Sequence, residues 1–435
     1  MALVEVLRTI FALGLLLLSA RLGGLVFVKI KQPTVIGEIL GGFLLGPTIF
    51  GVLLPQFRTE IFRSSEAFDL ITKIIYQSGL VLLMFISGLE TENIFAKGQR
   101  RTAMGLVFLG TFLPLAAGFA FAQSFDLQSF MGPTGTPISL AFVLGCAAAV
   151  TSLPVLSRIF IDLGILQTPF CRLILAAALM DDIILYVIMA LVLAVSNLNS
   201  GNALSIITIF LSGLPAIYQT VIAAVFQFCF AYVFIRFGFK VMDGLVTHVF
   251  KRFNLQDSTG FFLIGLLLII LLGQIFSVPL MLSSFCAGVS LSKRFHAINQ
   301  DKLFLKSFSI SYLIPIYFAI IGSRINLIEN FSFVFTLTFL VYATVVKTAS
   351  IWWAAKLARY PSKTSLDIAM TMNARGGPGI ILASIAYDAK IINLSLFTTL
   401  ILLAILTCLF SAFWLRWRLK NNDLDTQLVD RRPLI

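Results

Sequence analysis

Charged side chains are scarce in this sequence. They make up 12% of the 435 residues, about half the share of a typical soluble domain, while 59% of the residues are hydrophobic. The mean hydropathy is +0.98. This balance excludes a string of soluble globular domains and predicts an integral membrane protein.

Residues that bind metals or carry out covalent chemistry are also few. The two histidines, His248 and His296, lie next to basic residues of loop character, so they do not indicate a metal site. Five cysteines lie in or beside apolar runs without paired spacing, which predicts packing residues rather than disulfides or metal ligands: Cys146, Cys171, Cys229, Cys286 and Cys408. No nucleophile has a base at a recognisable spacing. The sequence therefore indicates neither an enzyme nor a cofactor.

Apolar runs long enough to cross a bilayer recur along the whole chain. We expect an all-α polytopic membrane protein with about thirteen spans, at residues 5–29, 35–53, 68–90, 101–123, 137–159, 169–195, 204–240, 258–276, 279–293, 306–323, 331–357, 363–389 and 394–416. The run 204–240 is too long for one span. Pro215 is expected to divide it into a short interfacial piece and a helix beginning near Ala216.

The basic residues are distributed unevenly between alternate loops. With the N-terminus outside, most of the 32 lysines and arginines fall on the cytoplasmic face, including those of the C-terminal tail. This asymmetry predicts a multi-pass topology with a cytoplasmic C-terminus, and we expect the bacterial inner membrane as its location. It also explains the net charge of +12 without a nucleic-acid partner.

Two adjacent aspartates, Asp181 and Asp182, are the only charges between Leu173 and Val195. A carboxylate at that depth costs several kcal/mol or more. Successive helical residues point about 100° apart, so the two side chains should face different partners. We interpret the pair as a proton- and cation-binding site of a transporter; the alternative is a buried structural ion pair.

The chain also repeats short segments in the same order, with each partner seven expected spans later. The matched segments are Phe85–Glu90 with Ala319–Arg324, Gly41–Leu45 with Ala287–Leu291, and Thr151–Pro154 with Arg375–Pro378. An odd offset reverses direction in the membrane and predicts an inverted-topology repeat. We accordingly expect a first repeat at 1–195, a linker region at 196–255, a second repeat at 256–417 and a short cytoplasmic tail at 418–435.

Two of these matched segments should interrupt their helices near the middle of the membrane. Thr151, Ser152 and Pro154 break one helix, and Gly376, Gly377 and Pro378 break its counterpart, which leaves backbone groups without intrahelical partners. Such groups are tolerated only where protein or a water-filled cavity satisfies them, so the two breaks are expected to cross. Arg375 can compensate the dipoles of the half-helices. The alternative is that the prolines are packing kinks.

Lys347 is the remaining charge inside an apolar run, 331–353. It lies about 13 Å short of Lys356, where the interface should begin, which is too far for easy snorkelling. A buried ammonium needs a partner, and the deep acidic candidates are Asp181, Asp182 and Glu38. We expect an Asp–Lys pair.

Several motifs together resemble the cation:proton antiporter superfamily, in the branch of the bacterial Kef-like and Nap-like sodium or potassium/proton exchangers. They are Pro33-x-x-x-Gly37-Glu38-Ile39-Leu40-x-Gly42, Gly46-Pro47, Gly88-Leu89-Glu90, Thr151-Ser152-Leu153-Pro154, Asp181-Asp182, Ala287-Gly288 and Asn373-x-Arg375-Gly376. The resemblance covers about residues 5–415. It implies a homodimeric scaffold, a mobile core, and exchange of cation and proton at the position of Asp182. Asp181 with Lys347 resembles the charge-moving sodium/proton exchangers.

The sequence therefore predicts an electrogenic Na⁺/H⁺ antiporter serving pH homeostasis, with H⁺, a monovalent cation, membrane lipid and a second copy as partners. The cation would bind at Asp182, with oxygens of Thr151 and Ser152 completing its coordination, since hard oxygen ligands suit an alkali cation. One alternative is a K⁺/H⁺ antiporter on the same scaffold. Another is a sodium-coupled solute symporter, which the lack of an obvious aromatic or arginine-lined pocket disfavours.

Overall fold

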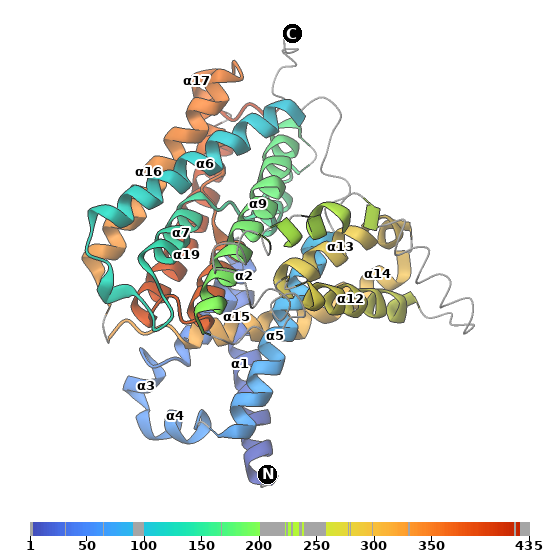
Figure 1. Ribbon diagram of the computed structural model, residues 1–435, viewed down its shortest axis with the longest axis vertical. Coiled ribbons are helices and arrows are strands. Elements are labelled where there is room, and N and C mark those ends of the chain that lie inside the picture. Colours follow the sequence, from blue (N-terminus) through green and yellow to red (C-terminus); the bar gives the residue numbers. More distant parts are fainter. Residues whose placement is uncertain are drawn as a thin grey trace.

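A computed structural model describes most of the chain (Figure 1). It covers residues 3–30, 32–63, 65–89, 100–166, 168–200, 258–276, 278, 280–297, 299–328, 331–421 and 423–426, and short pieces between 222 and 238. Within these residues the protein is helical throughout, and its one β-type contact is an isolated bridge between Met131 and Ile392. The expected all-α class is confirmed.

The long helices follow the expected apolar runs closely. They are α1 (Leu3–Lys29), α2 (Thr34–Leu44), α5 (Glu66–Leu89), α6 (Arg100–Ser124), α7 (Pro137–Ala149), α8 (Leu153–Asp162), α9 (Pro169–Ser200), α12 (Ser258–Ile275), α13 (Leu280–Ala297), α14 (Asn299–Phe308), α15 (Ile314–Ser323), α16 (Phe333–Leu357), α17 (Ser362–Thr371), α18 (Gly376–Asp388) and α19 (Leu394–Lys420). Short helices α3 (Phe50–Leu53) and α4 (Pro55–Ile61) follow α2, and a π-helical turn, Ser309–Leu313, joins α14 to α15.

Six of the described helices are long and apolar enough to cross a membrane, by length and composition. They are Val4–Lys29, Phe68–Leu89, Thr102–Ser124, Phe304–Ser323, Phe333–Leu357 and Leu394–Lys420. Shorter apolar helices, among them α2 and α7, add to these. The chain is therefore a multi-pass membrane protein. The number thirteen stays a prediction, because most of the expected span 204–240, including Pro215, lies outside the described residues.

The helices form two groups, and each group draws on both halves of the chain. In the first group, α1, α2 and α5 pack with α13 and α15; in the second, α6, α7 and α9 pack with α16 to α19. We call them the α5 group and the α9 group. Between the groups, α9 lies against α13 and α18 lies against α2. The halves of the sequence are thus interleaved in space.

Glycines let the helices of the α5 group approach until their backbones touch. A Cβ added at Gly42 of α2 would lie 2.0 Å from the carbonyl oxygen of Ala319 in α15, and one at Gly322 would lie 1.9 Å from that of Ile39. Gly88 of α5 meets α13 in the same way. In lipid the hydrophobic effect does not drive helices together, so their association depends on close van der Waals packing, which small residues permit. The glycine motifs of the matched segments therefore hold the group together.

We expect Gly42→Ala to destabilise the protein, because its methyl group would overlap the Ala319 carbonyl and force α2 and α15 apart. Overpacking of this kind costs about 1–3 kcal/mol, and occasionally more. Gly14→Ala is the matched control, since nothing lies within 4 Å of a Cβ at that position. The measurement is the melting temperature of the detergent-purified protein. Equal melting temperatures for the two variants would contradict this packing.

Candidate functional site

The two helix breaks lie in contact with each other. Between α7 and α8, the Ser152 N–H donates to the carbonyl oxygen of Ala374 at 2.6 Å, and the Thr151 Oγ1 hydroxyl donates to that of Met372 at 3.1 Å. Met372 and Ala374 belong to the break between α17 and α18. Backbone groups freed at one break are therefore satisfied by the other, as burial away from water requires.

The breaks begin slightly earlier in the sequence than the glycine and proline residues suggested. Gly376, Gly377 and Pro378 form the first turn of α18, and Pro154 is the second residue of α8. Proline is tolerated in a first turn because the N–H that it lacks has no intrahelical acceptor there. Pro154 and the run Gly376–Pro378 thus start the second half of each helix, whereas Thr151 and Ser152 lie in the break itself.

Two buried cations cover the carbonyl end of α7. The Arg375 guanidinium donates from Nε to Ala147 at 3.0 Å and from Nη2 to Ala148 at 3.2 Å. Lys347 Nζ donates to the next carbonyl, that of Ala149. The C-terminus of a helix carries partial negative charge and unpaired carbonyl groups, so both cations are well placed to neutralise it. Arg375 therefore lies where the sequence analysis expected compensation of a helix dipole.

Lys347 is fully buried and uses three acceptors. Its Nζ lies 3.1 Å from Asp181 Oδ2 and 2.9 Å from the carbonyl oxygen of Gly110, and it also contacts Ala149. These contacts match the three protons of an ammonium group. Of the three deep carboxylates, the lysine pairs with Asp181. Glu38 lies in α2 of the other helix group, buried beside Gly24 of α1.

Asp181 is fully buried, and protein groups hold both of its oxygens. Thr111 Oγ1 of α6 donates to Oδ1, whereas Thr151 Oγ1 donates to Oδ2 at 2.8 Å beside Lys347. A carboxylate in this setting is stabilised by charge-assisted hydrogen bonds. Asp181 is thus tied to three separate elements: α6, the α7–α8 break and α16.

Asp182 lies in a different environment, as the angle between neighbouring helical residues predicts. Its side chain is buried, and the Oδ1 atom has no hydrogen-bond partner among the described residues. The backbone amide of Leu153, at the positive end of α8, interacts with the carboxylate. A buried carboxylate oxygen without a partner is costly and indicates a place where a proton or a cation binds.

The two hydroxyl residues expected beside Asp182 take other positions. Thr151 contacts Asp181, and Ser152 Oγ accepts from the Val155 N–H at 3.4 Å at the start of α8. No hydrogen bond joins either hydroxyl to Asp182 within the described part of the chain. Gly376 is required here, since its φ is +28° and an added Cβ would lie 2.8 Å from Ser152 Oγ.

Sequence reasoning did not identify Thr111. It stands in an apolar run, Gly105–Gly118, that carries no charge, and the one proline of that run, Pro114, lies inside α6 rather than at its end. One weak signal exists: the threonine follows Gly110, whose Cβ would lie 4.0 Å from Lys347 Nζ. That signal has meaning only once α6 and α16 are known to be neighbours.

A multi-pass membrane protein with two crossing helix breaks beside a buried Asp–Lys pair has the architecture of a secondary transporter. The sequence matches the family described as "Sodium/hydrogen exchanger, transmembrane" over residues 15–421. The chain therefore belongs to the sodium/hydrogen exchanger family.

Named relatives agree with this assignment. The chain is 25% identical over 404 residues to the Na⁺/H⁺ antiporter NhaS4 of Synechocystis sp., covering 90% of this chain and 92% of that one. It is 22% identical over 418 residues to the Na⁺/H⁺-K⁺ antiporter GerN of Bacillus cereus, covering 95% and 97%. The solved structure of the sodium proton antiporter MjNhaP1 from Methanocaldococcus jannaschii superposes with a TM-score of 0.64 at 17% identity, covering 94% and 97%. At that identity the likeness shows the shared fold.

Proposed function

We propose that the protein is a secondary-active antiporter that exchanges a monovalent cation, Na⁺, for protons at Asp182. The observation that carries the proposal is the contrast between the two aspartates. Protein donors hold both oxygens of Asp181, whereas Asp182 Oδ1 has no partner among the described residues. One buried carboxylate that must be either protonated or cation-bound makes the two ions compete for a single site.

Candidate oxygen ligands for a cation lie in the α7–α8 break. Ser152 and Thr151 occupy the break directly before α8, whose first amide, that of Leu153, interacts with the carboxylate. Hard oxygen ligands suit an alkali cation and offer nothing that favours a thiophilic metal. In this proposal the cation is cargo, as membership of the sodium/hydrogen exchanger family implies.

The Asp181–Lys347 pair supports an electrogenic version of this exchange. When a cation enters beside Asp182, it competes electrostatically with the Lys347 ammonium for the same acidic surroundings. Release of a proton from Lys347 at that moment would give two protons per monovalent cation. One net charge would then move in each cycle, and each 100 mV of membrane potential acting on it contributes about 2.3 kcal/mol.

Two alternatives differ from Na⁺/H⁺ exchange. GerN bears a name that includes K⁺, and a K⁺/H⁺ antiporter would use the same scaffold. A sodium-coupled solute symporter would need a recess for its solute. The small apolar cavity lined by Val150 and Pro378, beside the helix breaks, has a volume of about 10 Å³, which is too small for an organic solute.

The location, the oligomeric state and the repeat boundaries in this proposal are inferred from the sequence. We place the protein in the bacterial inner membrane as a homodimer with a cytoplasmic tail, 418–435, where it would serve pH homeostasis. Its repeats would be 1–195 and 256–417, joined by 196–255. The grouping of helices from both halves supports this division, because an inverted repeat pairs corresponding elements across a pseudo-twofold axis.

Asp182→Asn should abolish exchange and leave a folded protein, because asparagine keeps the size of the side chain but can neither release a proton nor neutralise a cation. The measurement is dissipation of a pH gradient in proteoliposomes on addition of Na⁺, Li⁺, K⁺ or Rb⁺. Asp181→Asn should be milder, with slower transport. Glu60→Gln, an exposed carboxylate of α4, is the control and should behave as wild type. Wild-type exchange in Asp182→Asn would end the proposal, and the cation series decides between Na⁺ and K⁺.

Lys347→Gln should leave slower and electroneutral exchange, because glutamine can occupy the site and donate a hydrogen bond but cannot carry a proton. The measurement is the capacitive current per cation translocated on supported membranes, for the variant and the wild type. A variant that transports with undiminished current per cation would show that Lys347 is a structural counter-ion of Asp181.

A further inference from the structure

Among the described contacts of Asp181, the one with Thr111 comes from α6, a helix outside the crossing. The threonine is fully buried, and its hydroxyl donates to Oδ1, the oxygen that Lys347 and Thr151 leave unused. With Thr111 in place, protein groups donate hydrogen bonds to both oxygens of the Asp181 carboxylate. Without it, Asp181 would present an open oxygen, as Asp182 does.

We propose that Thr111 is a positioning residue that keeps Asp181 turned towards Lys347 and so leaves Asp182 as the only carboxylate available to the cation. This inference rests on the proposed function. Removing the hydroxyl would free Oδ1 in a low-dielectric setting, where an unpaired carboxylate oxygen seeks a new partner. Lys347 already holds Oδ2, so a cation at Asp182 could take up the freed Oδ1, and Asp181 would become a second ligand.

The test compares Thr111→Val, which has nearly the same shape without the hydroxyl, with Thr111→Ser, which keeps the hydroxyl. A second carboxylate ligand should bind Na⁺ more tightly and release it more slowly. We therefore expect KM and kcat of Thr111→Val to fall together. The expected change is about tenfold, the size of the effect when a hydrogen bond to a charged group is lost. Thr111→Ser should stay within about twofold of wild type. Thr111→Ala should reproduce the valine result, which separates loss of the hydroxyl from a change of packing.

An unchanged KM in Thr111→Val, or a fall in kcat alone, would overturn this role for Thr111. Failure of the proposed function would show separately, as exchange that survives Asp182→Asn.

A second and independent observation lies at the end of the molecule opposite the C-terminal tail, where α15 and α18 finish. Arg324, directly after α15, forms an ion pair with Asp388, the last residue of α18, with Nη1 2.9 Å from Oδ1. The two side chains are 31% and 35% exposed. This ion pair joins the α5 group to the α9 group.

Aromatic side chains extend this link towards the interior. The Arg324 guanidinium carbon lies 4.9 Å from the centre of the Tyr76 ring of α5, a cation–π distance, and the rings of Tyr76 and Tyr317 lie 5.0 Å apart. Both tyrosines are buried, and their hydroxyl groups have no hydrogen-bond partner among the described residues. The Arg324–Asp388 ion pair therefore links the two helix groups at this end, and the cation–π contact fixes its arginine against α5.

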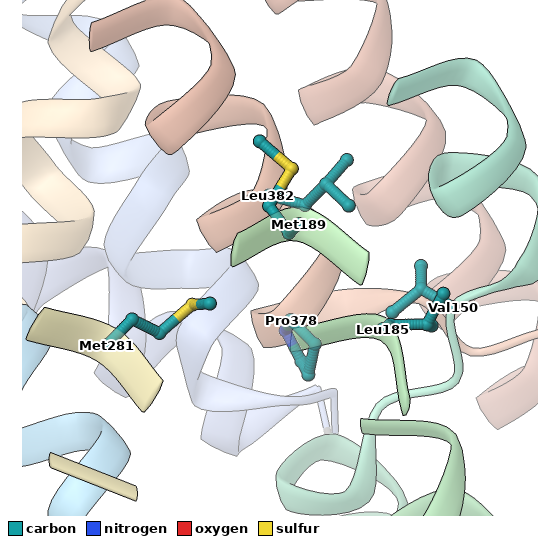
Figure 2. A pocket seen from close by; sticks show the side chains of 6 residues that line it. All are labelled: Val150, Leu185, Met189, Met281, Pro378 and Leu382. Carbon is teal, nitrogen blue, oxygen red and sulfur yellow. The ribbon is translucent and has the colours of Figure 1, made fainter. Parts of the chain in front are cut away.

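An apolar layer separates these contacts from the aspartates. Figure 2 shows a small cavity between the groups, with Met281 on one side and residues of α9, α18 and the α7–α8 break on the other; it is lined by Val150, Leu185, Met189, Met281, Pro378 and Leu382. Its volume of about 10 Å³ leaves room for about one water molecule, and no lining residue is polar. This lining offers no polar group that could replace the water around a hydrated cation. At this end an apolar layer thus lies inside the polar contacts.

The opposite end is held together differently. There Asp367 of α17 accepts from Arg418 of α19 at 2.7 and 2.8 Å, and Arg418 also pairs with Asp423 of the tail at 3.1 Å. All of these residues belong to the α9 group or to the tail. Arg416 of α19 also donates to the carbonyl oxygen of Ile30, directly after α1, at 3.4 Å.

We infer that Arg324, Asp388 and Tyr76 form a latch that holds the Asp388 end closed and has to open in each transport cycle. With the tail in the cytoplasm, the latched end faces outward. This inference rests on the chain being a transporter that exposes its site to each side in turn. The strength of the latch would set the population of the state that is open at the Asp388 end.

The latch can be tested without measuring transport. Leu382→Cys, in a background lacking the five native cysteines, places a thiol in the apolar layer, where labelling by a membrane-impermeant maleimide added outside reports opening. Asp388→Asn and Arg324→Gln should each raise the labelling rate about two- to fivefold, the range for a partly exposed ion pair. The charge swap Arg324→Asp with Asp388→Arg should return it towards the starting value. Arg63→Gln, an exposed arginine at the same end, is the control and should change nothing.

Unchanged labelling in both single variants, or a charge swap that labels as fast as the single variants, would overturn the latch. If labelling behaves as expected but Asp182→Asn still exchanges ions, the latch stands and the proposed ion-exchange site falls.

Discussion

The structure depends on one constraint: backbone groups and charges inside a membrane must find their partners within the protein. Two broken helices free several carbonyl and amide groups at the crossing, where lipid offers no hydrogen bonds. Arg375 and Lys347 cover three successive carbonyls of α7, while the Thr151 hydroxyl and the Ser152 amide cover those that follow α17. Removing any of these partners would leave a buried polar group without compensation, which is why such a crossing needs buried cations.

The same contacts connect this framework to the proposed chemistry. Lys347 is shared between the end of α7 and the carboxylate of Asp181, so a change in its charge acts on a helix end and on the ion site together. Thr151 likewise bridges Asp181 and the backbone of the other break. Because the groups that hold the crossing also surround the aspartates, loading the site with a proton or a cation should alter the forces on the half-helices. Such coupling is what a transporter needs in order to link binding to movement.

Contacts between the two helix groups differ in kind from the contacts within a group. Within the α5 group, glycines bring helix backbones into direct contact, as Gly42 and Gly322 do between α2 and α15. Between the groups, the closure consists of flexible side chains, notably Met281 opposite Leu382 and Arg324 opposite Asp388. Backbone contacts of the first kind fix a geometry, whereas side chains can separate and meet again at modest cost. The packing therefore favours movement of one group against the other over deformation inside either.

The sequence by itself determined the helical membrane class, because a long apolar segment in lipid satisfies its own backbone hydrogen bonds by forming a helix. It also located the aspartates, Lys347 and the two breaks, because charged residues and prolines stand out in apolar segments. Only the tertiary structure decided which groups meet. It placed Thr151 on Asp181 rather than Asp182, brought in Thr111, and paired Arg324 with Asp388. These contacts join residues on different helices, and a threonine in an apolar run has no pattern of its own. Partners across helices depend on how the helices pack, which no local stretch of sequence encodes.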